Sequence, residues 1–247
     1  MPKTPLFSAI VLTLFPEMFP STLGFSLAGR ALERGIWSLK TLQIRDFATD
    51  KHKTVDAPPY GGGTGMVLKP EVVDAAIAHA KTLFSPTPNP QSPPPTIIYP
   101  SPRGIPLTQS LAEELKNQQL IIVCGRFEGL DQRVIDEHNM LEVSLGDFIL
   151  SGGEIPALAI IDACVRLLPE VIGNSDALSQ ESFNTHSEYA GLLEYPHYTR
   201  PPIWNERCVP DVLLSGNHKQ INDWRLEQAK AITKARRPDL LVKKHKE

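Results

Sequence analysis

The sequence predicts an α/β protein with a mostly parallel sheet, and three observations lead to that prediction. Short apolar segments alternate with segments of helical spacing through the first two thirds of the chain. Several of these apolar segments end in glycine-rich loops, which is typical of strands in such sheets. The composition, with 41% hydrophobic and 21% charged side chains over 247 residues, is that of a globular chain with a substantial core.

The amino-terminal part of the chain alternates between strand and helix patterns. Residues 7–15 are apolar and β-rich, residues 18–34 have helical spacing, and residues 38–47 alternate as a strand does. A glycine cluster at 60–66 precedes a helix expected at 70–84, which starts on a proline, a favoured first-turn residue. This part therefore predicts two strands and two helices.

A proline-rich segment at 85–95 is expected to be an exposed excursion, since residues 85–96 hold six of the 23 prolines. Three strand–loop–helix units follow, with strands at 96–99, 120–124 and 140–145, loops at 100–104, 125–129 and 146–154, and helices at 108–117, 131–138 and 155–168. In a parallel sheet, ligands bind outside the carboxyl ends of the strands, where these loops are expected. The sequence thus predicts a pocket built from loops.

The rest of the chain predicts a second, smaller domain. We expect a first domain at 1–171, a flexible and polar linker at 172–190, and a mainly helical domain at 191–247 whose basic helix starts near Asn217. From Arg225 onward there are eight Lys or Arg residues and three acidic ones, whereas the whole chain has a net charge of −3. This local basic surface suits a polyanion, although a solvated helix and tail would explain the charge equally well.

The cysteines indicate a reducing compartment. Cys124, Cys164 and Cys208 lie far apart and form no C-x-x-C pair, so neither a disulfide framework nor a structural zinc site is expected. Cys124 and Cys164 fall in apolar runs and are expected in the core. No segment is long enough to cross a bilayer, and residues 7–15 lack the flanks of a signal peptide. Together these features predict a cytoplasmic protein.

The loops lack the familiar nucleotide-binding signatures. No G-x-G-x-x-G joins a strand to a helix, and the glycine cluster has no G-K-[S/T], which excludes Rossmann and Walker loops. Glycines let the backbone approach a flat ligand closely, so a purine-containing ligand or another small ligand is expected. The polar side chains that could serve the pocket are Glu128, Arg126, Asp147, Glu154, Arg166, Asp176 and Glu181. Structural roles stay open for them, such as a helix cap for Arg166 and a first-turn acid for Glu154.

Six motifs give the chain a close resemblance to one family. They lie at 14–19, 55–63, 123–134, 145–154, 195–201 and 210–218, and they include the runs VCGRFEGLDQRV, LGDFILSGGE, YPHYTRP and PDVLLSGNH. In their order, over nearly the whole chain, they resemble the motifs of the bacterial tRNA (guanine-N1)-methyltransferases of the knotted SPOUT class.

The resemblance implies a fold and an activity. The family's α/β domain has a deep trefoil knot that forms the cofactor pocket, an exception to the rule that chains avoid knots. Members are homodimers with each active site at the subunit interface, and they bind S-adenosylmethionine in a bent form. They methylate N1 of guanine at tRNA position 37, beside the anticodon, when another guanine precedes it. Magnesium is also implied for activity, although no ligand spacing specifies a metal site and Glu128 is only a conceivable contact.

Matching the motifs position by position assigns a cofactor pocket. Its expected residues are Tyr99, Pro100, Ser101, Pro102, Gly125, Glu128, Leu145, Gly146, Leu150, Gly152 and Gly153. Pro100 stands where the family often has leucine, and only its backbone and bulk are expected to matter.

The resemblance also assigns a catalytic pair. Guanine N1 carries a proton and is a poor nucleophile, so methyl transfer requires a general base and stabilisation of the charge that grows on O6. The matching positions are Glu181 for the base and Arg166 for the stabilising cation. The family's best-known members have aspartate at the first position, and Glu181 adds one methylene that a mobile linker could absorb. Asp176, outside the motif, is the alternative base.

The tRNA is expected to contact three regions. The residues implied are Asp56, Tyr60, Gly61, Ser215, Asn217, His218, Arg236 and Arg237. Two other functions stay open. One is a related knotted methyltransferase with another RNA target, which the linker carboxylate and the second domain disfavour. The other is a catalytically silent tRNA-binding protein of the same fold, which the presence of both Glu181 and Arg166 disfavours.

Overall fold

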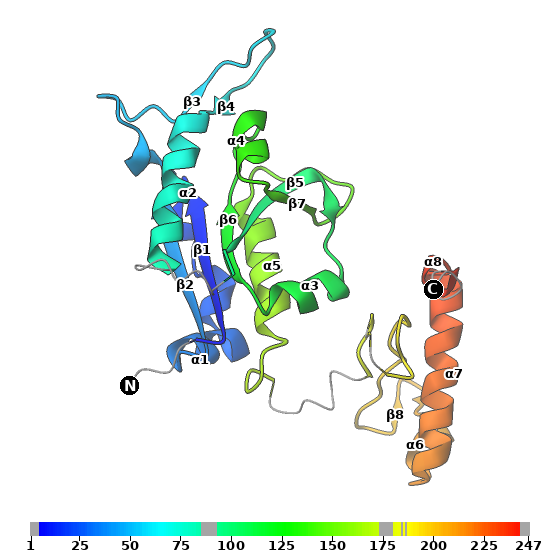
Figure 1. Ribbon diagram of the computed structural model, residues 1–247. Coiled ribbons are helices and arrows are strands. Elements are labelled where there is room, and N and C mark those ends of the chain that lie inside the picture. The colour runs from blue at the N-terminus through cyan, green and yellow to red at the C-terminus, as the bar shows by residue number, and fades with distance from the viewer. Residues whose placement is uncertain (1–4, 85–92, 173–179, 184, 186, 243–247) are drawn as a thin grey trace. The chain divides into compact units, whose positions relative to one another are not determined.

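Strands and helices alternate along the first of the two units into which the chain divides (Figure 1). A computed structural model gives the structure of the protein and describes residues 5–84, 93–172, 180–183, 185 and 187–242. The two units are Met1–Gly173 and Asn174–Glu247. The expected proline-rich excursion therefore lies largely outside the described residues.

A five-stranded sheet forms the centre of the first unit, and all of its pairings are parallel. Its order is β2-β1-β6-β5-β7. The strands are β1 (Phe7–Thr13), β2 (Trp37–Gln43), β5 (Thr96–Pro106), β6 (Gln119–Val123) and β7 (Leu141–Ser144). The central strands are apolar along almost their whole length because helices cover both faces of the sheet. The predicted α/β class with a mostly parallel sheet is thus confirmed.

Helices cover the two faces of the sheet in two sets. They are α1 (Ser26–Glu33), α2 (Pro70–Phe84), α3 (Gln109–Leu115), α4 (Gln132–Glu137) and α5 (Glu154–Val165). Buried residues of α1, α3 and α5 share one core with Ala9 and Val11 of β1, whereas those of α2 and α4 share the other core with Ile10 and Leu12. This alternation follows from the two-residue period of a strand, so β1 contributes to both cores.

The main departures from the expected elements lie in four places. The helix expected at 18–34 is replaced by two 3₁₀ turns, Pro16–Met18 and Ser21–Gly24, before the shorter α1. Ser21 and Ser26 have φ of 50° and 55°, and such residues interrupt a right-handed helix. The strand expected at 38–47 ends at Gln43 and continues as the 3₁₀ turn Ile44–Phe47.

The other two departures concern strands that the pattern did not predict in full. β5 continues past Tyr99, with a bulge between Pro100 and Ile105, both of which pair with Val143. The loop that holds the glycine cluster is the tip of a small antiparallel hairpin, β3 (Asp56–Ala57) and β4 (Val67–Leu68).

The second unit is small and has its own core. Its elements are β8 (Ile203–Trp204), β9 (Arg207–Cys208), α6 (Asp211–Leu214), α7 (His218–Arg236) and α8 (Asp239–Val242). Tyr189, Leu192 and Tyr195 pack with Ala229 of α7, and all four are buried. Buried Thr233 accepts a hydrogen bond from the Leu193 N–H at 2.8 Å, which joins α7 to the segment before it.

Part of the expected linker at 172–190 is hydrogen-bonded to this second unit. The Phe183 N–H donates to the Leu192 carbonyl at 3.0 Å, and the Tyr195 hydroxyl donates to the Gln180 side chain at 2.6 Å. These bonds hold residues 180–183 against the segment that contains the buried tyrosines.

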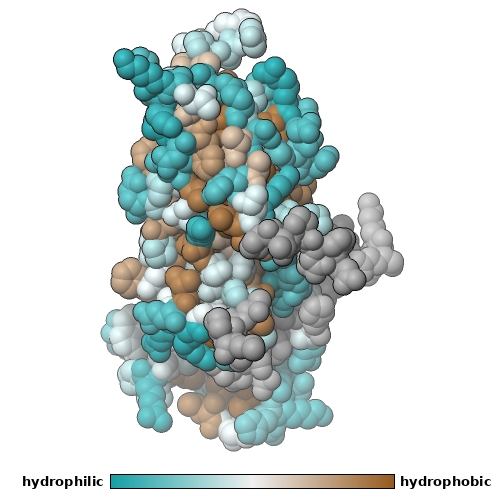
Figure 2. Space-filling model, turned by 60° about the vertical axis from the view of Figure 1, so that its left-hand side comes forward, coloured by the Kyte–Doolittle hydropathy of each residue, from teal (hydrophilic) through white to brown (hydrophobic). Residues whose placement is uncertain are grey.

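Large apolar side chains also reach the surface. Figure 2 shows apolar side chains (brown) lying between hydrophilic ones (teal) on one face of the molecule. In the first unit, the exposed large apolar residues include Phe25, Leu27, Tyr60, Phe127, Phe148, Ile149 and Ile155. No helix in the described ranges is long and apolar enough to cross a membrane.

We expect Cys208 to be the thiol that reacts with iodoacetamide in the folded protein near pH 8, because it is exposed. Burial raises the pKa of Cys124 well above its usual value, with Glu154 adding to the rise. Burial also raises the pKa of Cys164 to about 12. A raised pKa keeps both core thiols protonated and unreactive well above pH 8. Intact mass should show one modification before unfolding and three after it, and modification of a core thiol in the folded protein would contradict this packing.

Candidate functional site

The order of the sheet brings two loops and a bulge together. β6, β5 and β7 are neighbours and parallel, so the loops after β6 and β7 lie beside the bulge of β5, where a loop was expected at 100–104. These three segments enclose a cavity of about 320 Å³. Its lining residues are Tyr99, Pro100, Ser101, Pro102, Gly125, Arg126, Phe127, Glu128, Gly129, Val143, Ser144, Leu145, Gly146, Phe148, Ile149, Leu150, Ser151, Gly152, Gly153 and Pro156.

All eleven residues expected at the cofactor pocket line this one cavity. Nine further residues line the cavity, and no motif assigned them to the cofactor, among them Phe127, Phe148 and Ile149. Most of these nine residues lie inside the same glycine-rich loops, so their position in those loops was the available signal. The pocket is therefore formed almost wholly by the loops after β6 and β7 and by residues Tyr99–Pro102 at the bulge of β5.

Two of the loops are joined through their backbones. The Gly153 N–H donates to the Gly125 carbonyl at 3.0 Å. A Cβ atom at Gly153 would lie 2.8 Å from Cα of Cys124, so only glycine permits this approach. Beside them Tyr99 is buried, and burial raises the pKa of its hydroxyl. The hydroxyl therefore stays protonated near neutral pH and can serve as a hydrogen-bond donor.

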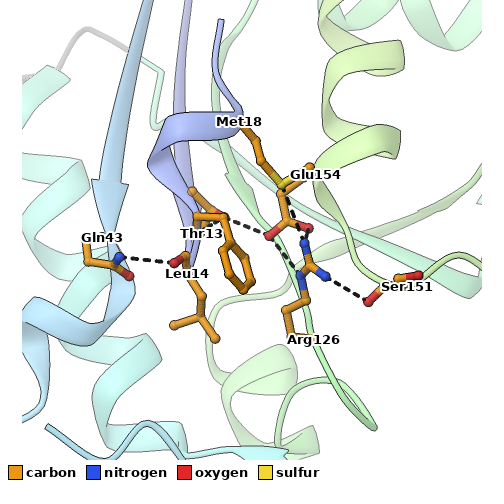
Figure 3. A network of polar contacts seen from close by, with 8 residues as sticks. Thr13, Leu14, Met18, Gln43, Arg126, Ser151 and Glu154 are labelled. Atoms are coloured by element: carbon orange, nitrogen blue, oxygen red, sulfur yellow. Dashed lines mark hydrogen bonds and ion pairs between the residues drawn. The ribbon is translucent and has the colours of Figure 1, made fainter. Parts of the chain in front are cut away.

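The carboxylate of Glu154 joins the end of β1 to the loop after β6 (Figure 3). Its Oε1 accepts hydrogen bonds from Thr13 Oγ1 at 2.7 Å and from Arg126 Nε at 3.2 Å. Its Oε2 lies 3.0 Å from Arg126 Nη2, an ion pair without the alignment of a hydrogen bond. Glu154 is 1% exposed, so its charge requires the nearby guanidinium for compensation.

The guanidinium of Arg126 is held on its other sides as well. Nη1 donates to the Ser151 carbonyl at 3.3 Å, and Nη2 lies 3.6 Å from the sulfur of Met18. The group also stacks over the ring of Phe15, 4.4 Å from its centroid. A Cβ atom at Gly152 would lie 2.4 Å from Arg126 Nε, so the loop closes over the arginine only with glycine there. Arg126 thus fixes one wall of the cavity.

The hairpin that carries the glycine cluster is attached to the loop of Glu128. The Glu128 N–H donates to the Met66 carbonyl at 2.9 Å, and the Leu68 N–H donates to the Gly129 carbonyl at 2.9 Å. At the hairpin, Tyr60 is 99% exposed. Of the residues expected to contact tRNA, Asp56, Tyr60 and Gly61 therefore belong to an element bonded to the cavity's own loop.

The expected catalytic residues lie in different units. Arg166 follows the last turn of α5, and its backbone N–H donates to the Asp162 carbonyl at 3.0 Å. It lines a second cavity of about 260 Å³ together with Asp162, Phe25 and Leu27. Glu181 is half-buried in the second unit. Asp176, the alternative base, lies outside the described residues.

The remaining tRNA-binding candidates lie in or near α7. Some of them already have hydrogen-bond or ion-pair partners within the second unit. The Ser215 hydroxyl donates to the Val212 carbonyl, and Asn217 caps α7 by accepting the Gln220 N–H at 3.2 Å. Arg237 is paired with Asp239 at 2.7 Å, which raises the arginine's pKa. His218 and Arg236 are exposed. Capping and ion pairing therefore explain Ser215, Asn217 and Arg237 without a ligand.

The acidic and imidazole side chains form no evident metal centre. Within the described ranges there is no group of three or more His, Cys, Asp or Glu side chains that could hold an ion.

Glu154→Gln is expected to lower the free energy of unfolding by about 3 kcal/mol, because it leaves Arg126 without its buried counter-charge and sets an amide beside Nη2. Urea unfolding followed by circular dichroism measures the change. Glu142→Gln is the matched control, since the Arg103–Glu142 pair is exposed on its arginine side and should contribute less than about 1 kcal/mol. Equal losses in the two variants would contradict a special role for the buried pair.

Comparison with known proteins identifies the family of this chain. The family model described as tRNA (Guanine-1)-methyltransferase TrmD matches residues 7–243. Relatives named tRNA (guanine-N(1)-)-methyltransferase include one from Rickettsia akari (strain Hartford), 56% identical over 94% of this chain and 97% of its own. One from Rickettsia prowazekii (strain Madrid E) is 55% identical over 94% and 96%, and one from Rhodospirillum rubrum is 54% identical over 94% and 91%. This chain therefore belongs to the tRNA (guanine-1)-methyltransferase family.

Proposed function

We propose that the protein transfers a methyl group from S-adenosylmethionine to N1 of guanine 37 of tRNA, beside the anticodon. One observation carries the proposal: the eleven residues assigned to the cofactor from motifs far apart in the chain line a single cavity at the carboxyl edge of the sheet. The relatives named tRNA (guanine-N(1)-)-methyltransferase support the choice of tRNA and of guanine N1. Because tRNA is the substrate, we infer a cytoplasmic location.

The cavity suits the cofactor in size and chemistry. Its volume of about 320 Å³ lies at the lower end of the range of small-molecule pockets, and its glycines expose backbone donors and acceptors to a flat adenine. The carboxylate of Glu128 lines it, so one acidic side chain is available to a hydroxyl or cationic group of the ligand. S-adenosylmethionine, when bound, supplies a methyl group attached to a positively charged sulfur.

The catalytic pair would act on the guanine. Glu181 would accept the N1 proton as the bond between N1 and the methyl carbon forms and the bond from that carbon to sulfur breaks. Arg166 would stabilise the negative charge that grows on O6. The sulfur leaves as a neutral thioether, and the products are N1-methylguanine and S-adenosylhomocysteine. The bonds of residues 180–183 to the second unit give the Glu181 backbone a fixed support.

Exposed apolar side chains support a homodimer whose active site lies at the subunit interface. Phe127, Phe148 and Ile149 line the cofactor cavity and are 60%, 53% and 79% exposed. Phe25, beside the cavity of Arg166, is 75% exposed. Apolar groups gathered around functional residues are typical of a protein interface. A partner subunit could cover them while it supplies the second half of each site.

The knot is the remaining part of the proposed architecture. It is proposed from the family to which the chain belongs. The second unit is proposed to bind tRNA, with exposed Arg236 near the phosphates. Magnesium, which the resemblance implied, has no ligand cluster among the described residues and is assigned no site.

We expect the purified protein to methylate a tRNA transcript with guanines at positions 36 and 37, and not one with adenine at 37. Labelled S-adenosylmethionine reports the transfer, and digestion with mass spectrometry identifies the modified base. Methylation of another base or of a ribose would favour a related enzyme with a different target. Cofactor binding without transfer to either transcript would favour a tRNA-binding protein without catalysis.

Glu181→Gln is expected to lower kcat by at least about 100-fold, because an amide cannot accept the N1 proton. The dissociation constant for S-adenosylmethionine should not change, since Glu181 does not line the cofactor cavity. Glu188→Gln, a change to an exposed acid of the same unit, is the matched control and should keep normal turnover. Near-normal turnover by Glu181→Gln would remove that residue from the mechanism.

A further inference from the structure

The motif Tyr-Pro-His-Tyr-Thr-Arg-Pro at 195–201 has no place in the proposed chemistry, yet it forms one wall of a cavity within the second unit. This cavity has a volume of about 560 Å³, and α7 forms another wall with Trp224 and Arg225. It lies wholly in residues 195–225 and shares none with the cofactor cavity. The size is within the range that holds small molecules.

The walls of this cavity combine aromatic rings with positive charge. Tyr198 and Trp224 lie with ring centroids 6.3 Å apart at an angle of 58°, and Tyr198 is 48% exposed. Two guanidinium groups, those of Arg200 and Arg225, line the cavity, and no Asp or Glu is among its lining residues. Rings and cations without a carboxylate favour a planar ligand that carries negative charge.

One hydrogen-bond donor of the Arg225 side chain has no acceptor among the described residues. This donor is Nε, which is buried. The guanidinium lies over the ring of Tyr195, 5.0 Å from its centroid, and Arg225 is among the residues that line the cavity. The wall that α7 contributes therefore carries a cation beside an aromatic ring.

We propose that this cavity binds one unpaired nucleotide of the tRNA, with the base against Tyr198 and Trp224 and its phosphate near Arg200 and Arg225. The proposal rests on tRNA being the substrate. An unpaired nucleotide has the two features that the walls select, an aromatic face and an anionic oxygen. Within a paired stem the base faces are stacked on their neighbours, so only a splayed nucleotide can enter. The site would hold a tRNA nucleotide other than the guanine that is methylated.

The test measures the affinity of the full chain for the tRNA transcript by filter binding over a series of salt concentrations. Trp224→Ala should weaken binding about tenfold through loss of one stacked base, and Trp224→Phe should recover most of it. Arg200→Gln should reduce the slope of log affinity against log salt by about 1. Arg200 is exposed, so this variant should fold normally.

Two controls separate the cavity from general effects. Arg207→Gln removes an exposed arginine of the same unit that does not line the cavity, and its affinity should equal that of the wild type. Every variant should bind S-adenosylmethionine normally, because that pocket lies in the other unit. Light scattering of each variant should give the mass of the wild type.

The outcomes distinguish this subsite from the proposed function. If the wild type binds and methylates tRNA while Trp224→Ala and Arg200→Gln match it, the subsite is overturned and the function stands. If weaker binding accompanies a change in oligomeric mass, the cavity holds a segment of another copy, which also overturns the subsite. If the wild type does not bind tRNA at all, the proposed substrate and the subsite are overturned together.

Discussion

The buried charge of Glu154 is the constraint on which the site depends. A carboxylate with 1% exposure cannot remain ionised without a partner, so the chain must bring Arg126 to it from the loop after β6. Thr13 completes the set from the end of β1. The contacts of Glu154 therefore link the carboxyl ends of β1, β6 and β7. The loop at Gly152 lies directly against the arginine, which leaves no room for a Cβ atom there.

Five of the residues that line the cavity are glycines, and that has a chemical consequence. Glycines in the loops after β6 and β7 leave amide and carbonyl groups uncovered, so recognition can follow the shape and hydrogen-bond pattern of a flat ligand. Few charged side chains line the cavity, chiefly Arg126 and Glu128, and the first of these is already engaged by Glu154. Glu128 is thus the acidic side chain that a ligand would meet.

The residues of the proposed site are divided between the two units. The first unit holds the loops and Arg166, and the second holds Glu181, the basic helix α7 and an aromatic cavity of its own. Separate cores allow each unit to keep its internal geometry whatever the other does.

The sequence by itself determined the α/β class, the helix Pro70–Phe84 and the glycine-rich loops that line the pocket. The spacing of apolar residues, a proline in the first helical turn and clusters of glycine are local signals, so each is visible without the tertiary structure. It did not determine the turns before α1, since φ above zero at Ser21 and Ser26 has no signal in those residue types. Only the tertiary structure decided the order β6-β5-β7 that gathers the loops, and the pairing of Arg126 with Glu154. Both depend on contacts between residues distant in the chain, whose energies arise from packing and burial and not from local pattern.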